Sequence, residues 1–356
     1  MKKQLYSLLL LLSAAWMFTA CSSDDDNNTV IDWETYSRTI FAAAAGNWGQ
    51  NNGAVGAIDA DNSGKYSYTD IYKTANGKLV GDAQDVLPLY HKLYVASTTS
   101  SKIEVLDEKG KVEKAILKPG AQFRYLATDY DHVYVSAYNG YIYKLTNGDL
   151  TDSVKVGGYP EAMSVANGKL YVNMSDYKYD NSGKSISVID LKSFKKTKEL
   201  DCELNPYNQS VAVGNKVYFV STYHADQDGA LQCIDATTDK ITNTGVKASA
   251  IAYDKVGNSI VALLTGYDAN WTLSVKSFFR YSLADGKTTQ LDHSAFTSPQ
   301  QVNVDPVSGR IFVIDNPSYT APSSLYIYDN SGKLLQGGLQ MSYSVQNIRF
   351  FAEAYK

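Results

Sequence analysis

Residues 91–111 read HKLYVASTTSSKIEVLDEKGK, two short apolar segments that lead into a polar turn. The first has an apolar–aromatic–apolar core, Leu93-Tyr94-Val95, and the second alternates apolar and polar residues as far as Asp107. Alternation at every second residue is typical of a strand with one packed face. The stretch therefore predicts two successive strands followed by a tight turn.

This unit recurs along the chain. This core returns at residues 133–135, 170–172, 217–219, 260–262 (where valine replaces the aromatic residue) and 311–313, and less typically at 40–42. The residues before the seven following turns are Ile58, Leu106, Leu145, Ile189, Ile234, Ser282 and Tyr328. They lie 39 to 48 residues apart, 45 on average. Self-similarity at about 40–50 residues, with several short strands in each unit, is the signature of a β-propeller.

A third segment precedes each aromatic core, for example FRYLATD at residues 123–129 and PEAMSVA at 160–166. We expect it to be the innermost strand of a four-stranded antiparallel blade. Its seventh copy, residues 345–351, is at the C-terminal end, and the first aromatic core has none before it. Pairing the last strand with the first blade would leave no free edge. The prediction is an all-β, seven-bladed propeller with few helices, closed by its C-terminal strand.

The pentapeptide DNSGK occurs at residues 61–65, 180–184 and 329–333. The first copy, with Asp59 before it and Asp70 beyond it, imitates a calcium-binding loop. A true loop of that kind lies between helices and ends in Glu. Equivalent turns read DEKGK and LADGK, so we interpret the copies at 61–65 and 329–333 as turns between paired strands. The copy at 180–184 falls elsewhere in its blade, between the second and third strands.

The N-terminus predicts export. Lys2 and Lys3 precede an apolar run and then Ala20-Cys21, which is the pattern of a bacterial lipoprotein signal. We expect a signal peptide at residues 1–20, lipid on Cys21, a flexible acidic tether over residues 21–37 and the propeller over 38–356. The tether resembles the acidic signal that directs lipoproteins to the outer face of the outer membrane in Bacteroidetes-type bacteria. A plain polar spacer is the alternative.

Charge and cysteine usage narrow the function. Removing residues 1–20 leaves 31 basic and 37 acidic residues, a net charge of −6, which argues against nucleic acid as a partner. Cys202 and Cys233 would then be the remaining cysteines, and they could pair or be buried free thiols. Neither has the neighbours of a zinc site.

Catalytic signals are weak. The chain has no Gly-x-Ser-x-Gly elbow, no phosphate-binding glycine loop and no His-Glu-x-x-His. His91 and His132 occupy matching places before aromatic cores, where turn residues are expected. Repeated carboxylates occupy one position in different blades and favour a capping role: Asp107, Asp190, Asp235 and Asp329. We therefore expect a protein that binds and does not catalyse, without a cofactor or metal.

The binding signal lies in the loops. In a propeller, the connections between second and third strands and those that enter the innermost strand emerge on one face, here called the loop face. Large aromatic and amide side chains suit a floor that stacks on a bulky, mostly neutral ligand. Any one of these rings could instead pack beneath its own loop, and Arg124 could pair with a carboxylate or contact the ligand. The candidates are Trp48, Gln50, Asn51, Asp82, Gln84, Arg124, Tyr125, Tyr138, Tyr159, Tyr177, Tyr207, Tyr223, His224, Trp271, Tyr319 and Tyr343.

Three segments, GNWGQNNGAVGAID (46–59), IYKTANGKLVGDAQDV (71–86) and HKLYVASTTSSKIEVLD (91–107), carry a family resemblance. From about residue 41 onward the chain resembles the YncE-like propeller lipoproteins of Bacteroidetes-type bacteria, often described as a domain of unknown function. The group includes BtuG-type proteins, which capture vitamin B12 at the cell surface and pass it to a TonB-dependent outer-membrane transporter. The resemblance implies the same role here, with a corrinoid on the loop face.

Two other functions remain open. Aromatic platforms also stack on sugar rings, so a surface glycan-binding protein is the first alternative. A propeller hydrolase or lyase is the second, and it would require His and carboxylate side chains clustered in the channel.

Overall fold

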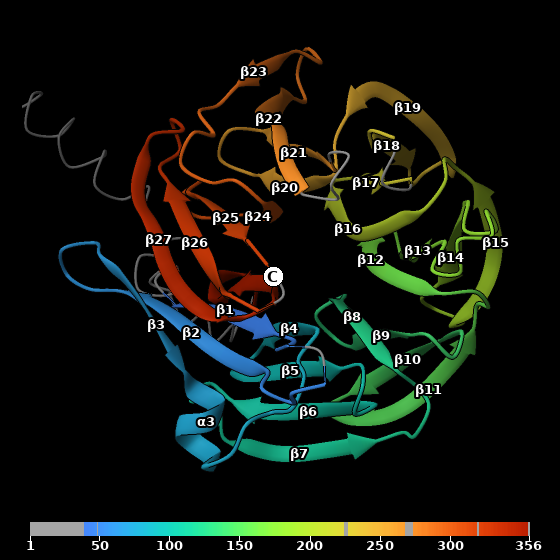
Figure 1. Cartoon of the computed structure of the whole chain (residues 1–356). Coiled ribbons are helices and arrows are strands. Elements are labelled where there is room, and N and C mark those ends of the chain that lie inside the picture. The colour runs from blue at the N-terminus through green and yellow to red at the C-terminus, as the bar shows by residue number, and fades with distance from the viewer. Residues whose placement is uncertain (1–38, 48, 224–226, 268–272, 319, 355–356) are drawn as a thin grey trace, which may run out of the picture. The chain divides into compact units, whose positions relative to one another are not determined.

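The computed structural model describes residues 39–354, apart from 48, 224–226, 268–272 and 319. The described strands form seven four-stranded antiparallel sheets arranged around a central channel (Figure 1). Each sheet is one blade, numbered here from the sheet that contains β1. The predicted seven-bladed propeller is confirmed.

Every blade has the strand order that the repeat predicts. The innermost strands are β28 (Val345–Phe350), β4 (Asp85–Leu89), β8 (Phe123–Thr128), β12 (Pro160–Ala166), β16 (Pro206–Val213), β20 (Ala250–Asp254) and β24 (Pro299–Val304). The second strands are β1 (Thr39–Ala44), β5 (Lys92–Ser97), β9 (Val133–Ala137), β13 (Lys169–Met174), β17 (Lys216–Ser221), β21 (Ser259–Tyr267) and β25 (Ile311–Asp315).

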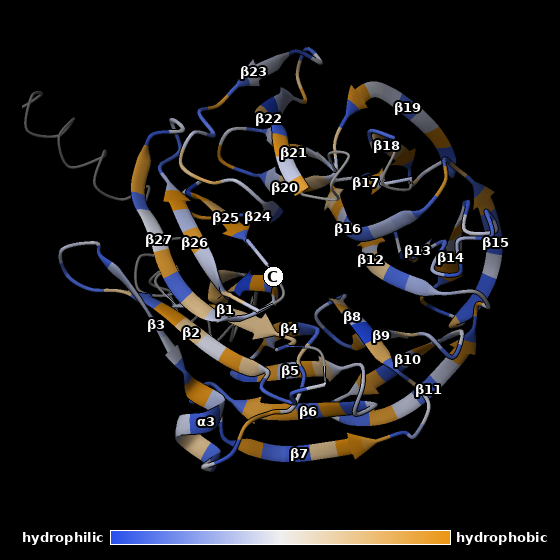
Figure 2. Cartoon of the chain, viewed as in Figure 1, coloured by the Kyte–Doolittle hydropathy of each residue, from blue (hydrophilic) through white to orange (hydrophobic). Residues whose placement is uncertain are grey.

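The outer half of each blade follows. The third strands are β2 (Ala54–Ala60), β6 (Lys102–Asp107), β10 (Tyr141–Thr146), β14 (Ser185–Asp190), β18 (Ala230–Asp235), β22 (Leu273–Ser282) and β26 (Pro322–Tyr328). The outermost strands are β3 (Tyr66–Asp70), β7 (Val112–Leu117), β11 (Asp149–Lys155), β15 (Lys195–Asp201), β19 (Lys240–Lys247), β23 (Thr288–Gln290) and β27 (Leu334–Tyr343). Outer strands such as β11, β15 and β19 are mostly hydrophilic (Figure 2), as expected where one side faces water.

The ring closes as the sequence predicts. β28 pairs with β1 in antiparallel register, with Phe350 opposite Ile40 and Ile348 opposite Ala42. The last strand is therefore the innermost strand of the first blade, and no innermost position is left empty. Phe350 also packs edge-on against Phe312 of the seventh blade, with ring centres 5.2 Å apart.

The core lies between neighbouring blades. The aromatic residues of the second strands, among them Tyr134, Tyr171 and Phe312, are almost fully buried and contact the adjacent sheet. The helical part of the described chain consists of α3 (Ile71–Asn76) and a single 3₁₀ turn, η1 (Phe351–Ala354). Neither is long and apolar enough to cross a membrane.

The DNSGK copies at residues 61–65 and 329–333 are turns between third and outermost strands. In the first, the Asp61 carboxylate accepts hydrogen bonds from the amides of Ser63 and Lys65, and Gly64 has a φ of +81°, which glycine adopts without strain. Asp329 makes the same contacts in the other copy. Asp70 caps the N-terminus of α3, so it does not complete a calcium loop.

The repeated carboxylates cap turns, as expected. Asp107, Asp190 and Asp235 each accept hydrogen bonds from amides two to four residues further on. His91 and His132 lie in the turns between first and second strands and contact Glu108 and Asp129. Cys202 and Cys233 are free thiols, and burial raises the pKa of both, that of Cys202 to about 12.

Candidate functional site

A chain of hydrogen bonds crosses the loop-face end of the channel and links the innermost strands of four neighbouring blades. Gln84 Nε2 donates to Gln346 Oε1 at 3.4 Å, and Arg124 Nη1 donates to Gln84 Oε1 at 2.8 Å. Arg124 Nε then donates to Glu161 Oε2 at 2.9 Å. Gln346, Arg124 and Glu161 lie at the loop-face ends of β28, β8 and β12, and Gln84 directly precedes β4, so the antiparallel repeat itself brings the four side chains together.

The pair formed by Arg124 and Glu161 is buried: 8% of the surface of Arg124 is exposed, and none of the surface of Glu161. Burial raises the pKa of Glu161, an effect that Arg124 opposes. Burial would lower the pKa of Arg124, but Glu161 and the neighbouring tyrosines Tyr138, Tyr125 and Tyr207 together outweigh burial and raise this pKa well above its ordinary value. Of the two expectations for Arg124, pairing with a carboxylate is the one that the structure displays.

Three tyrosine rings lie directly beside this pair and form a contact group that we call the tyrosine cluster: Tyr138, Tyr159 and Tyr177. Their ring centres are 4.7 to 5.3 Å apart. Tyr138 donates its hydroxyl to Glu161, and the guanidinium of Arg124 lies 4.6 Å from the Tyr138 ring centre. Burial, followed by the charge of Glu161, raises the pKa of Tyr138, so the hydroxyl keeps its proton.

The cluster reaches the surface through Tyr177, which is 56% exposed. Lys178 Nζ lies 5.6 Å from the Tyr159 ring centre, and Tyr179 is 74% exposed. All three residues belong to the loop between β13 and β14, which also contains the DNSGK copy at residues 180–184. Gly183 in that copy lies against the backbone of Asp176, where a side chain would clash. The tight packing of this glycine helps to fix the loop that presents Tyr177.

Two more predicted residues join the network below the cluster. Tyr125 Oη accepts a hydrogen bond from Gln84 Nε2 at 3.3 Å, and burial raises its pKa. Burial also raises the pKa of Tyr207, to about 12. The charge of Glu161 raises this pKa further and Arg124 lowers it, since the Tyr207 hydroxyl lies near the buried pair. The structure therefore brings together seven of the predicted residues: Gln84, Arg124, Tyr125, Tyr138, Tyr159, Tyr177 and Tyr207.

Other predicted residues lie on the loop face with different roles. Asp82 accepts hydrogen bonds from the amides of Thr99 and Ser100 and so shapes the β5–β6 loop. Tyr223, in the fifth blade, donates to Glu203 Oε2 at 3.0 Å. Three further predicted residues lie in other places: Gln50 and Asn51 are exposed in the β1–β2 loop, and Tyr343 is half-buried at the end of β27.

Five predicted residues lie outside the described residues. They are Cys21, Trp48, His224, Trp271 and Tyr319. Their parts in lipidation or ligand binding stay predictions.

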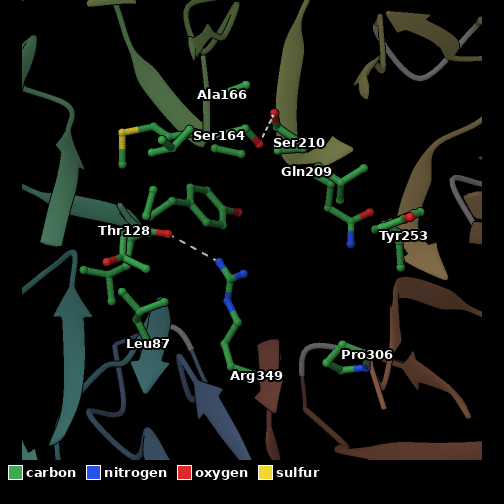
Figure 3. Close-up of a pocket in the computed structure, with 18 of the residues that line it drawn as sticks. Leu87, Thr128, Ser164, Ala166, Gln209, Ser210, Tyr253, Pro306 and Arg349 are labelled. Atoms are coloured by element: carbon green, nitrogen blue, oxygen red, sulfur yellow. Dashed lines mark hydrogen bonds between the residues drawn. The ribbon is translucent and has the colours of Figure 1, made fainter. Parts of the chain in front are cut away.

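A cavity of about 1100 Å³ occupies the opposite end of the channel from the loop face (Figure 3). It is lined by the later residues of the innermost strands and by the turns that follow them, including Asp129, Lys255 and Pro306. Tyr125 borders both the cavity and the network below the tyrosine cluster. The buried network therefore separates the loop-face site from the cavity.

A hydrolase or lyase of this fold would need His and carboxylate side chains clustered in the channel. No histidine is among the described residues that line the cavity. In the described part of the chain, no three His, Cys, Asp or Glu side chains gather where they could hold a metal ion. The buried carboxylates next to the channel, Glu161 and Asp85, both contact arginine side chains.

Two charged residues are missing from the sequence-based site. Glu161 occupies the place in β12 that Arg124 occupies in β8, and opposite charges at matching positions of adjacent blades were the available signal. Arg349 lines the cavity from β28. Aligning the innermost strands reveals it as a charge at a position that is otherwise uncharged.

No family model matches the chain, and no curated protein is found to be similar to it. Several solved structures are similar in fold. A quinonprotein alcohol dehydrogenase-like protein from Bacteroides thetaiotaomicron has a TM-score of 0.64 and 17% identity, over 89% of this chain and 79% of that one. A protein from Lactobacillus plantarum has a TM-score of 0.65 and 18% identity, over 88% and 99%.

A third similar structure is a putative 6-phosphogluconolactonase from Bacteroides fragilis, with a TM-score of 0.65 and 13% identity over 91% of this chain and 99% of that one. The names of these proteins differ, and identities this low establish the fold alone. The comparisons therefore support the β-propeller architecture of this chain.

Proposed function

We propose that the protein captures a bulky, largely uncharged ligand at the tyrosine cluster on its loop face and releases it chemically unchanged. The observation that carries the proposal is the group of three touching tyrosine rings, one of them 56% exposed, above a buried and charge-compensated pair. Aromatic faces stack on flat or apolar ligand surfaces, while hydroxyl and amide groups fix orientation.

The electrostatics favour a neutral ligand. The positive charge of Arg124 is compensated by Glu161, so the floor beneath the rings carries little net charge. The site is also held in place before binding, because the network links four blades through buried hydrogen bonds. A preorganised surface loses less conformational freedom on binding and can bind tightly without catalysis.

The ligand that we propose to test first is cobalamin or another corrinoid, on the basis of the resemblance to BtuG-type proteins. Cobalamin is broad, fringed with amides and nearly neutral, which suits aromatic rings beside amide side chains. Within this proposal the chain is a lipoprotein anchored to the outer membrane through Cys21, with the propeller outside the cell. It passes the ligand to a TonB-dependent transporter.

A surface glycan is the competing ligand, because the exposed face of Tyr177 could also stack on a sugar ring. Calorimetric titration of the full chain with cyanocobalamin and, separately, with neutral oligosaccharides distinguishes the two. We expect one molecule of cobalamin to bind per chain and the oligosaccharides to give no heat. Binding of an oligosaccharide without cobalamin would transfer the proposal to glycans, and the absence of both would refute ligand capture.

Two variants test the location. Tyr177→Ala removes the exposed ring and should weaken cobalamin binding about five- to thirtyfold, since one stacking contact contributes about 1–2 kcal/mol. The matched control is Tyr90→Asn on the opposite face. Tyr90 is 48% exposed and has a φ of +43°, a region that Asn tolerates, so the fold and the binding should both persist.

A further inference from the structure

One register position of the innermost strands faces the cavity in all seven blades. The residues at this position lie opposite the middle residues of the second-strand cores, and each one lines the cavity: Leu87, Ala127, Ser164, Val211, Ala252, Asn303 and Arg349. Six of the seven are uncharged. Arg349 therefore places a single cationic group in a ring of small, apolar and neutral side chains.

Arg349 is held so that its guanidinium reaches into the cavity (Figure 3). Nη2 donates to Asp85 Oδ2 at 3.3 Å and to the Leu126 carbonyl at 3.4 Å. Asp85 also accepts shorter hydrogen bonds, from Asn347 Nδ2 at 2.8 Å and from the Leu126 amide at 2.9 Å. Asp85 thus orients the guanidinium of Arg349. The negative charge of Asp85 is at the same time shared among several hydrogen-bond donors. The Arg349 side chain remains 27% exposed.

The other cavity walls favour donors over charged acceptors. Lys255 lines the cavity at the turn after β20, and Tyr253, two residues earlier and within β20, lines it as well. Asp129 is the only carboxylate among the described lining residues, and it already accepts hydrogen bonds from the His132 amide and the Tyr134 hydroxyl. An acceptor group on a ligand would therefore meet donors, above all the Arg349 fork.

The size and the walls define the remainder of the ligand. Ligand pockets usually measure about 300–1,000 Å³, and this cavity, at about 1100 Å³, is slightly larger. Much of the wall is aliphatic, as at Met163, Ala212 and Val304. The buried network at the loop-face end means that a ligand would enter from the face of the first-to-second-strand turns.

We propose that this cavity is a second binding site, which takes a small organic carboxylate with an apolar body. The carboxylate accepts hydrogen bonds from the guanidinium of Arg349, and the body packs against the aliphatic wall. The site lies at the opposite end of the channel from the tyrosine cluster, so it does not depend on the ligand proposed for the loop face.

The probes are 2-naphthoate and its neutral analogue 2-naphthamide, titrated into the full chain by calorimetry or by their fluorescence. We expect 2-naphthoate to bind one molecule per chain at least tenfold more tightly than 2-naphthamide. Arg349→Gln should reduce 2-naphthoate binding to the level of 2-naphthamide, and Arg349→Lys should retain part of the preference. Equal binding of both probes to the unaltered chain would overturn the proposal.

A second variant keeps the test decisive if Arg349→Gln does not fold. Ala212 is an exposed residue that lines the cavity, and Ala212→Trp should block it and abolish binding of 2-naphthoate without disturbing the core. Tyr177→Ala, at the other end of the channel, should leave 2-naphthoate binding unchanged. Undiminished binding to Ala212→Trp, or loss of binding in Tyr177→Ala, would place the probe elsewhere and refute the cavity site.

Discussion

The guanidinium of Arg124 lies 4.6 Å from the ring centre of Tyr138, and both residues donate to the carboxylate of Glu161. A cation–π contact and a shared acceptor thus join a buried ion pair to the tyrosine cluster. Since the ring of Tyr138 touches the rings of Tyr159 and Tyr177, the position of the exposed ring depends on the charge pair beneath it. The network supports the candidate site as well as the channel end of the fold.

The first prediction concerns this pair. Glu161→Leu should lower the free energy of unfolding by about 3–5 kcal/mol, because it leaves the Arg124 charge buried without its carboxylate. Replacing both residues by apolar ones, Arg124→Met with Glu161→Leu, should cost markedly less than either single change. Urea denaturation measures all four proteins, and additive losses would contradict strong coupling between the two side chains.

The second prediction separates the hydroxyl of Tyr138 from its ring. Tyr138→Phe removes the hydrogen bond to Glu161 but keeps the ring in contact with Tyr159 and Tyr177. The unfolding free energy should fall by about 1–3 kcal/mol, since a hydrogen bond to a charged acceptor is lost. Ligand affinity should change less than threefold, in contrast with Tyr177→Ala. A larger loss of affinity in calorimetry would mean that the hydroxyl contacts the ligand directly.

The architecture could be predicted because the sequence pattern of one blade recurs several times along the chain. Most blades repeat an apolar–aromatic–apolar core and an Asp-headed turn, so a departure in one copy, as at residues 260–262, does not hide the period. The closure of the ring could be predicted because the first blade has no innermost strand before it and an innermost-strand segment remains at the C-terminal end. The face on which the loops emerge followed from strand order alone.

The site was predictable only in part, for a physical reason. Strand order brings the blade ends to one face, but it does not decide which side chains touch across the channel. Arg124 meets Glu161 because β8 and β12 are adjacent, while Tyr223, one blade beyond, turns to Glu203 instead. Arg349 could not be predicted as a cavity residue because the direction of its side chain follows from the register of β28 with β1 and not from the local composition.

The third prediction is a pH dependence between the fourth and fifth blades. Asp239 accepts hydrogen bonds from Lys169 Nζ and from the Tyr171 hydroxyl, both at 2.7 Å, and also from Lys198. Burial alone would raise the pKa of Asp239, but these donors lower it from 3.8 to about 2. Because the pKa is lower in the folded chain, the ionised carboxylate stabilises the fold above about pH 4. The stabilisation, at most about 2 kcal/mol, should disappear as the pH falls from about 4 to about 2.

Asp239→Asn tests this assignment. The variant should be less stable than the unaltered chain at pH 6 and equally stable at pH 2, when thermal unfolding is followed at both pH values. Asn also tolerates the φ of +58° at this position, so backbone strain should not contribute. A stability difference that stays constant from pH 6 to pH 2 would assign the effect to packing and not to the carboxylate charge.

The fourth prediction concerns ring closure by the C-terminal strand. Phe350 is 1% exposed, lies opposite Ile40 of β1 and packs against Phe312 of β25, so it joins the first and seventh blades. Phe350→Ala leaves a cavity at this junction and should lower the unfolding free energy by about 3–5 kcal/mol.

Leu335→Ala, on the outermost strand of the seventh blade, is the control. Because Leu335 is 48% exposed, this substitution should lower the unfolding free energy by less than about 0.5 kcal/mol. If the ring is closed through β28, the loss in Phe350→Ala should appear as a single cooperative transition in urea. An early separate transition would show instead that the first blade opens independently of the other six.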